Sequence, residues 1–114
     1  MSITSNIHRA VLNNDVPMII HFLKEGYSID SIDDYNGDTP LHKAVWRKNH
    51  VLIKLLIAAG AKIDIANKYG ETPLHFAFYK TDNQTISILL EAGANINARN
   101  IYYKSPVDVL LANI

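Results

Sequence analysis

The sequence contains no cysteine, no excess charge of either sign and no long apolar run. Without cysteine, the chain has no disulfide framework, no thiolate metal site and no cysteine nucleophile. Its 11 Lys and Arg balance 11 Asp and Glu, whereas a nucleic-acid-binding domain normally carries a basic surplus. No apolar stretch approaches the ~18 residues of a membrane helix, and the first residues lack the regions of a secretory signal. These absences predict an intracellular, cytoplasmic domain that binds neither nucleic acid nor a membrane.

The length and the composition together predict one folded unit. The chain has 114 residues, of which 48% are hydrophobic and 19% charged. Disorder requires few apolar residues and a large net charge, and this chain has neither. We therefore expect a single domain over residues 1–114 with a small hydrophobic core.

Proline and glycine are few, but they recur at a fixed interval. The segment 37–44 (GDTPLHKA) returns as 70–77 (GETPLHFA), a fainter copy begins near Ser5, and a partial copy begins at Ser105. A fixed period of this size predicts a stacked array of repeats. An interval of 33 residues separates the following landmarks: Pro40, Pro73 and Pro106; Gly37 and Gly70; Gly60 and Gly93.

Two of these segments carry a known signature. Residues 39–44 (TPLHKA) and 72–77 (TPLHFA) both fit T-P-L-H-x-A, the signature of the ankyrin repeat, whose period is about 33. The chain thus resembles the ankyrin family along nearly its whole length. The resemblance implies an all-α solenoid of about three and a half stacked helix-turn-helix repeats with β-hairpin-like fingers. We place the repeats near residues 1–33, 34–66 and 67–99, followed by a partial capping repeat at 100–114.

Each unit also has local signals for its helices. Thr39 and Thr72 are predicted N-caps of the first helices, and a proline follows each at the first helical position. Gly60 and Gly93 come directly after the second helices, where a left-handed residue is favoured. The Asn-Gly pair at 36–37 predicts a tight turn at the tip of a finger.

The C-terminal copy departs from the pattern. Tyr103 occupies the glycine position, Asp108 occupies the histidine position, and no second helix follows. This copy resembles a half-repeat cap, in which we expect Val107, Leu110 and Leu111 to pack on the preceding repeat. A fragment of a longer ankyrin protein is the alternative.

The five histidines do not form a metal site in this interpretation. His8, His42 and His75 share one repeat position, and the resemblance implies that this histidine forms hydrogen bonds within and between units. Zinc requires three or four converging ligands, and His21 and His50 lie on second helices. We therefore predict no metal and no cofactor.

The sequence also lacks the motifs of common enzymes. No G-x-S-x-G, phosphate-binding loop or G-x-G-x-x-G is present. The carboxylates are scattered, whereas a glycosidase-type pair must face one cleft. We predict that the protein is not an enzyme.

The aromatic residues suggest a binding surface. Trp46 and Tyr79 hold one repeat position, late in the first helix, where the resemblance places the concave face. Trp, Tyr and Arg are enriched at interface hot spots. The alternative is that these aromatics only pack along the groove and support the stack. The predicted partner-binding residues on the concave face and the fingers are Tyr35, Asn36, Asp38, Trp46, Arg47, Lys68, Tyr69, Glu71, Tyr79, Lys80 and Tyr102.

The resemblance implies a monomeric, non-catalytic module that binds another protein. A small inhibitor that blocks a partner enzyme is a second hypothesis, and a structural fragment is a third. Ile and Asn are heavily used, with 15 and 11 residues. This usage is typical of AT-rich genomes and suggests a protein of an intracellular microbe or a large virus that acts on host proteins.

Overall fold

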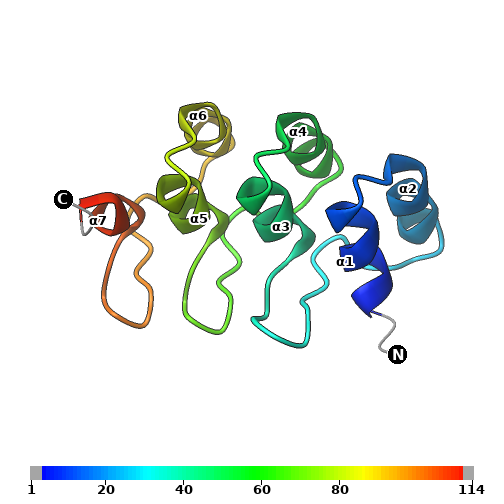
Figure 1. Ribbon diagram of the computed structural model, residues 1–114, viewed down its shortest axis with the longest axis horizontal. Helices are drawn as coiled ribbons and strands as arrows, with labels where there is room; N and C mark the ends of the chain where they lie inside the picture. Colours follow the sequence, from blue (N-terminus) through cyan, green and yellow to red (C-terminus); the bar gives the residue numbers. More distant parts are fainter. Residues whose placement is uncertain (1–3, 112–114) are drawn as a thin grey trace.

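The computed structural model describes the backbone of residues 4–111 and the side chains of residues 7–111. Within this range the chain forms helices joined by turns and loops, as Figure 1 shows. The helices are α1 (Thr4–Leu12), α2 (Val16–Lys24), α3 (Pro40–Trp46), α4 (His50–Ala58), α5 (Pro73–Tyr79), α6 (Asn83–Glu91) and α7 (Pro106–Leu111).

The helices form two layers along the long axis of the molecule. The first layer contains α1, α3, α5 and α7, each packed against the next, and the second contains α2, α4 and α6 (Figure 1). Long finger loops project from the first layer on the side away from the second (Figure 1). The described residues extend over 42 × 26 × 21 Å. The predicted all-α solenoid is confirmed.

Capping explains where the helices begin. Thr39 Oγ1 accepts a hydrogen bond from the backbone N–H of His42 at 3.2 Å, and Pro40 occupies the first helical position. The second helices use acidic or amide caps: Asn49 accepts from Leu52 N–H at the start of α4. Such caps bind backbone N–H groups that have no partner inside the helix.

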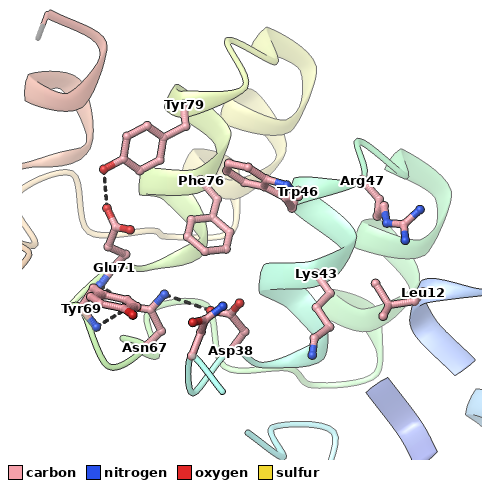
Figure 2. Close-up of a pocket in the computed structure, with 11 residues that line it drawn as sticks. Leu12, Asp38, Lys43, Trp46, Arg47, Asn67, Tyr69, Glu71, Phe76 and Tyr79 are labelled. Carbon is pink, nitrogen blue, oxygen red and sulfur yellow. Dashed lines mark hydrogen bonds between the residues drawn. The ribbon is translucent and has the colours of Figure 1, made fainter. Parts of the chain in front are cut away.

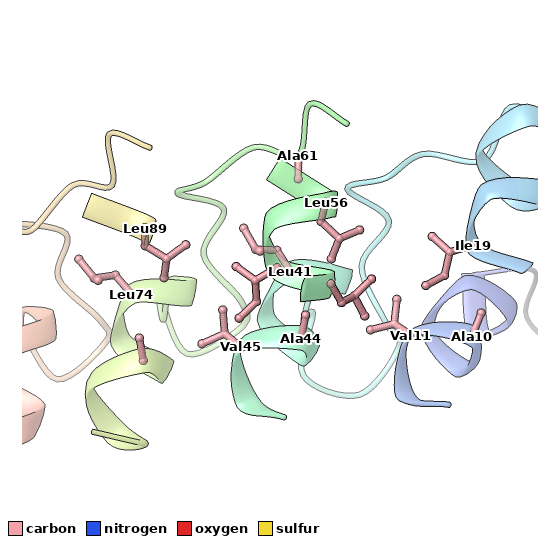
Figure 3. Close-up of a cluster of buried hydrophobic side chains, with 13 residues drawn as sticks. Ala10, Val11, Ile19, Leu41, Ala44, Val45, Leu56, Ala61, Leu74 and Leu89 are labelled. Carbon is pink, nitrogen blue, oxygen red and sulfur yellow. The ribbon is translucent and has the colours of Figure 1, made fainter. Parts of the chain in front are cut away.

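The core lies between the layers and between successive units. Figure 3 shows Leu41, Ala44 and Val45 of α3 within a continuous row of buried apolar side chains. Leu41 and Leu74 hold equivalent positions in successive repeats, and both are 1% exposed. Burial of such a side chain stabilises the fold by about 1.5–3 kcal/mol.

The fingers are turns that reverse the direction of the chain and are closed by backbone hydrogen bonds. No strand is present within residues 4–111. One or two backbone hydrogen bonds close each finger; in the second, Asn67 N–H donates to the carbonyl of Glu71 at 2.9 Å and Gly70 N–H to the carbonyl of Asn67 at 3.0 Å. One bond joins each finger to the next, such as that from Lys68 N–H to the carbonyl of Asn36 at 2.8 Å. A paired ladder would need more such bonds between adjacent segments.

Glycine is required at the tip of the second finger for two reasons. Gly70 has a φ of +72°, in the left-handed region that L-residues rarely adopt. A Cβ at this position would also lie 2.9 Å from Asn100 Cα. The close approach of the second and third fingers therefore depends on Gly70.

Two of the three repeat histidines tie one unit to the next. His42 Nδ1 accepts from Thr39 N–H at 3.0 Å, and His42 Nε2 donates to the carbonyl of Glu71 at 2.8 Å. His75 Nε2 donates in the same way to the carbonyl of Lys104 at 2.9 Å. Burial lowers the pKa of His42, so its ring stays neutral. The predicted structural role is confirmed for His42 and His75.

His8 differs from these two histidines. It is 3% exposed, and neither ring nitrogen has a hydrogen-bond partner of good geometry among the described residues, although the backbone of Ser31 lies close enough to raise its pKa slightly. Burial, assisted by the positive charge of Lys43, lowers the pKa of His8 to about 4. The carboxylates of Asp33 and Asp38 offset only part of this effect. His8 is therefore a buried neutral histidine whose protonation would destabilise the first unit.

The last helix, α7, completes the first layer by packing on α5. Asp108 Oδ2 accepts from Ser105 N–H at 3.0 Å, so a carboxylate replaces the histidine of the other capping boxes. Val109 is buried, whereas Val107 and Leu111 are 46% and 55% exposed. The expectation that Val107 and Leu111 pack inward was therefore wrong, because helical spacing turns Val109 toward α5 instead.

Candidate partner-binding groove

A groove of about 490 Å³ lies where the finger turns meet the exposed faces of α3 and α5 (Figure 2). We call it the concave groove. Its lining residues are Leu12, Asn36, Asp38, Lys43, Trp46, Arg47, Asn67, Tyr69, Glu71, Phe76 and Tyr79.

An aromatic strip forms the helix wall of the concave groove. Trp46 and Tyr79 are 46% and 39% exposed, and their ring centroids lie 6.5 Å apart. Phe76 packs against Trp46 edge to face, with centroids 5.1 Å apart (Figure 2). The predicted proximity of Trp46 and Tyr79 is confirmed, and Phe76 supports the strip from beneath. These rings offer apolar surface that the fold itself leaves half exposed.

A strong hydrogen bond fixes the far end of this strip. Tyr79 Oη donates to Glu71 Oε2 at 2.6 Å, as the dashed line in Figure 2 shows. Burial, together with the Glu71 carboxylate, raises the pKa of Tyr79 to about 12. The phenol therefore stays protonated at neutral pH, and its ring is held against the second finger, which carries Glu71.

The side-chain amide of Asn67 joins the first and second fingers, which together form the finger wall of the groove. Asn67 Nδ2 donates to Asp38 Oδ1 at 2.9 Å, and Asn67 Oδ1 accepts from the N–H groups of Tyr69 and Glu71. Asp38 is only 8% exposed. Its carboxylate thus joins the first finger to the second and presents little surface to a partner.

The first finger is held by one ion pair. Lys43 Nζ lies 2.7 Å from Asp33 Oδ2. Asp33 Oδ1 also accepts from the backbone N–H groups of Tyr35, Asn36 and Gly37. Although burial opposes ionisation, the Lys43 ammonium and these N–H groups hold the pKa of Asp33 well below its usual range.

Three further cations lie at or near the groove, with different environments. Lys80 Nζ lies 4.5 Å from the centroid of the Trp46 ring, within range of a cation–π contact. Lys68 Nζ donates to the carbonyls of Asp34 and Tyr35, which ties the second finger to the first. Arg47 is exposed, and its guanidinium has no hydrogen bond or ion pair with any residue that the structure describes.

The structure brings together only part of the predicted set. Tyr35 and Tyr102, which are 86% and 68% exposed, lie on finger turns outside the groove lining. Lys68 is engaged by its neighbouring finger. The predicted residues that line the concave groove are Asn36, Asp38, Trp46, Arg47, Tyr69, Glu71 and Tyr79.

The predicted set omitted four lining residues, Leu12, Lys43, Asn67 and Phe76, and the repeat interval indicates one of them. Leu12 stands 34 residues before Trp46 and therefore belongs to the same row. Lys43 and Phe76 share another repeat position, but neither was predicted to face the groove. Asn67 gave no such signal, because its role depends on the approach of two fingers.

Among the side chains of residues 7–111, no group of three or more His, Asp or Glu is placed to hold a metal ion. Within the same part of the chain, no helix has the length and hydropathy needed to cross a bilayer.

Comparison with known proteins agrees with the geometry. Residues 7–100 match the family described as ankyrin repeats (3 copies). The chain belongs to the ankyrin repeat family. An ankyrin repeat protein of fowlpox virus, FPV240, is 40% identical over 65 residues, which cover 57% of this chain and 16% of the relative. The monkeypox virus ankyrin repeat protein OPG189 is 43% identical over 45 residues, covering 40% of this chain and 8% of the relative. The chain therefore spans less than a fifth of either ankyrin relative.

Proposed function

We propose that this ankyrin protein is a monomeric, non-catalytic module that binds another protein through its concave groove and finger turns. The observation that carries the proposal is the half-exposed strip of Trp46 and Tyr79 in the groove. Ankyrin repeats generally mediate protein–protein interactions, which supports the same function.

The side chains of the aromatic strip are already held in place before a partner binds, which favours binding. Tyr79 is held by Glu71 and Trp46 rests on Phe76, so these rings lose little conformational freedom when a partner docks. Preorganised aromatic side chains reduce the entropy cost of association. They are also the residue types in which binding energy concentrates.

The relatives suggest the setting in which such binding takes place. Both are ankyrin repeat proteins of poxviruses, which are large DNA viruses. Together with the Ile- and Asn-rich composition, they support a host-directed protein of a large virus that acts inside the cell. We propose a host protein as the partner.

The test is the affinity of a purified partner for matched variants. Trp46→Ala is expected to weaken binding by about thirtyfold, equivalent to about 2 kcal/mol. Val51→Ser is the control, because Val51 is 76% exposed on α4 and outside the groove. Circular dichroism should show that both variants remain folded. Equal affinity of Trp46→Ala and the wild type would contradict the proposal.

The same complex separates an adaptor from an inhibitor. If the partner is an enzyme, its activity is measured with and without saturating ankyrin protein. A loss of activity assigns the inhibitory role that the sequence left open, and unchanged activity assigns the adaptor role.

A further inference from the structure

The charges around the concave groove are separated between its two walls. The finger wall carries the acidic residues Asp38 and Glu71, and the helix wall carries Arg47 beside Trp46, with Lys80 over the indole. The net charge of the chain is zero, so this separation is a local property of the groove.

The acidic groups on the finger wall are already bound by donors of the protein itself. Asp38 accepts from Asn67, and Glu71 accepts from the Tyr79 hydroxyl at 2.6 Å and from Asn100 Nδ2 at 3.4 Å. These bonds hold both carboxylates against the fingers, and Asp38 is only 8% exposed, so the finger wall presents little of its acidic surface to a cationic partner.

Lys43 on the helix wall is paired with Asp33, whereas Arg47 and Lys80 have no carboxylate partner among the described residues. The Arg47 guanidinium forms no hydrogen bond or ion pair with these residues, and Lys80 Nζ contacts the Trp46 ring at 4.5 Å. A guanidinium binds a carboxylate through paired N–H donors. Lys80 lies over the indole, and Arg47, the next residue after Trp46, lines the same groove, so carboxylates that reach these cations flank whatever covers Trp46.

We infer that the concave groove takes an acidic protein segment, in which an apolar side chain covers Trp46 and a flanking Asp or Glu pairs with Arg47 and Lys80. This inference rests on the proposed function and names the partner chemistry. The apolar side chain fills the space bordered by Trp46, Phe76 and Tyr79, and the carboxylate supplies the charge that the helix wall lacks.

The probe is a displayed library of random peptides of about twelve residues, selected on the full chain. Peptides that also bind Trp46→Ala are removed. The expected survivors carry Asp or Glu next to Phe, Leu or Trp. Survivors rich in Lys or Arg, or without charge bias, would overturn the inference and leave the proposed function standing. Absence of any survivor would also overturn it, because a short segment is the stated occupant.

Individual peptides then test the assigned cations. Fluorescence polarisation should show that Arg47→Glu weakens an acidic peptide by roughly tenfold and that added salt weakens it further. A matched peptide with Lys in place of Asp should bind Arg47→Glu better than the wild type. Lys54→Glu is the control, because it makes the same charge change on α4 outside the groove. Equal effects of Arg47→Glu and Lys54→Glu would overturn the inference.

Failure of the inference about an acidic partner can be distinguished from failure of the proposed function. If Trp46→Ala weakens the purified partner but acidic peptides are not preferred, only the partner chemistry is wrong. If neither the partner nor any peptide is sensitive to Trp46→Ala, the groove itself is not the binding site.

Discussion

At the scale of single residues, one repeat position serves different purposes along the chain. His42 and His75 each bond to the carbonyl at the end of the next finger. His8, at the same position, is also buried but has no hydrogen-bond partner of good geometry among the described residues, and receives only a weak contribution from the backbone of Ser31. The repeat motif therefore predicts where a histidine lies, while its bonds depend on the neighbouring unit.

This difference predicts a dependence of stability on pH. The pKa of His8 is about 4 in the folded protein, against an ordinary value of about 6.5 in the unfolded chain. Because the unfolded state binds the proton more readily, stability is fully present above about pH 6.5 and declines as the pH falls toward 4. The lowered pKa of His42 acts in the same direction. We expect the free energy of unfolding in urea to fall by a few kcal/mol between pH 7.5 and 4.5.

The variant His8→Leu tests whether His8 causes this dependence of stability on pH. It removes one titrating group, so the decline between pH 7.5 and 4.5 should become smaller. At pH 7.5 it should cost less than His75→Leu, which loses the bond to Lys104. An unchanged pH dependence in His8→Leu would show that this residue is not the source.

At the scale of elements, the finger turns are the part of the repeat that its motif describes least. The helices follow from local signals: threonine caps, proline at the first position and leucine at helical spacing. The turns depend on contacts between units, such as Asn67 with Asp38 and Gly70 with Asn100. Sequence reasoning therefore predicted the helices, the glycine turns and the row of Trp46 and Tyr79. It did not predict the burial of Asp38, because this burial depends on the distance between fingers.

Substitution of two glycines with positive φ, Gly93 and Gly70, distinguishes the cost of backbone strain from the cost of close packing. Gly93 has a φ of +96° and open space around its Cβ position, so Gly93→Ala should cost only about 1 kcal/mol. Gly70 has a φ of +72°, and its Cβ would meet Asn100 Cα at 2.9 Å. Because backbone atoms must also move, we expect Gly70→Ala to cost about 2–3 kcal/mol in urea unfolding. Similar losses in the two variants would mean that the fingers do not approach this closely.

At the scale of the whole molecule, stability is distributed over a linear stack. Each helix of the first layer contacts the next, from α1 through α3 and α5 to α7. In such an array each unit depends mainly on its neighbours, and an end unit protects the apolar face of the one before it. The cap of α7 differs from those of α3 and α5, because Asp108 accepts from Ser105 N–H within its own turn and forms, among the described residues, no bond like that of His42 or His75 to a neighbouring finger.

Removal of residues 100–111 together with the remaining C-terminal residues should therefore destabilise the rest. α5 would lose its contact with α7, and His75 would lose the carbonyl of Lys104. We expect an earlier thermal transition by circular dichroism and aggregation by light scattering. The full-length variant Val107→Ser is the control, since Val107 is 46% exposed and should tolerate the change. A truncated chain with an unshifted transition would contradict the role of α7.

The most direct test of the account is site-specific photo-crosslinking to a bound partner. A photoreactive phenylalanine analogue is placed at Arg47 in the concave groove and, separately, at Lys54 on α4 outside it. If the groove is the binding surface, irradiation yields a covalent complex with the partner from position 47 and little or none from position 54. A complex formed from position 54 and not from position 47 would contradict the account.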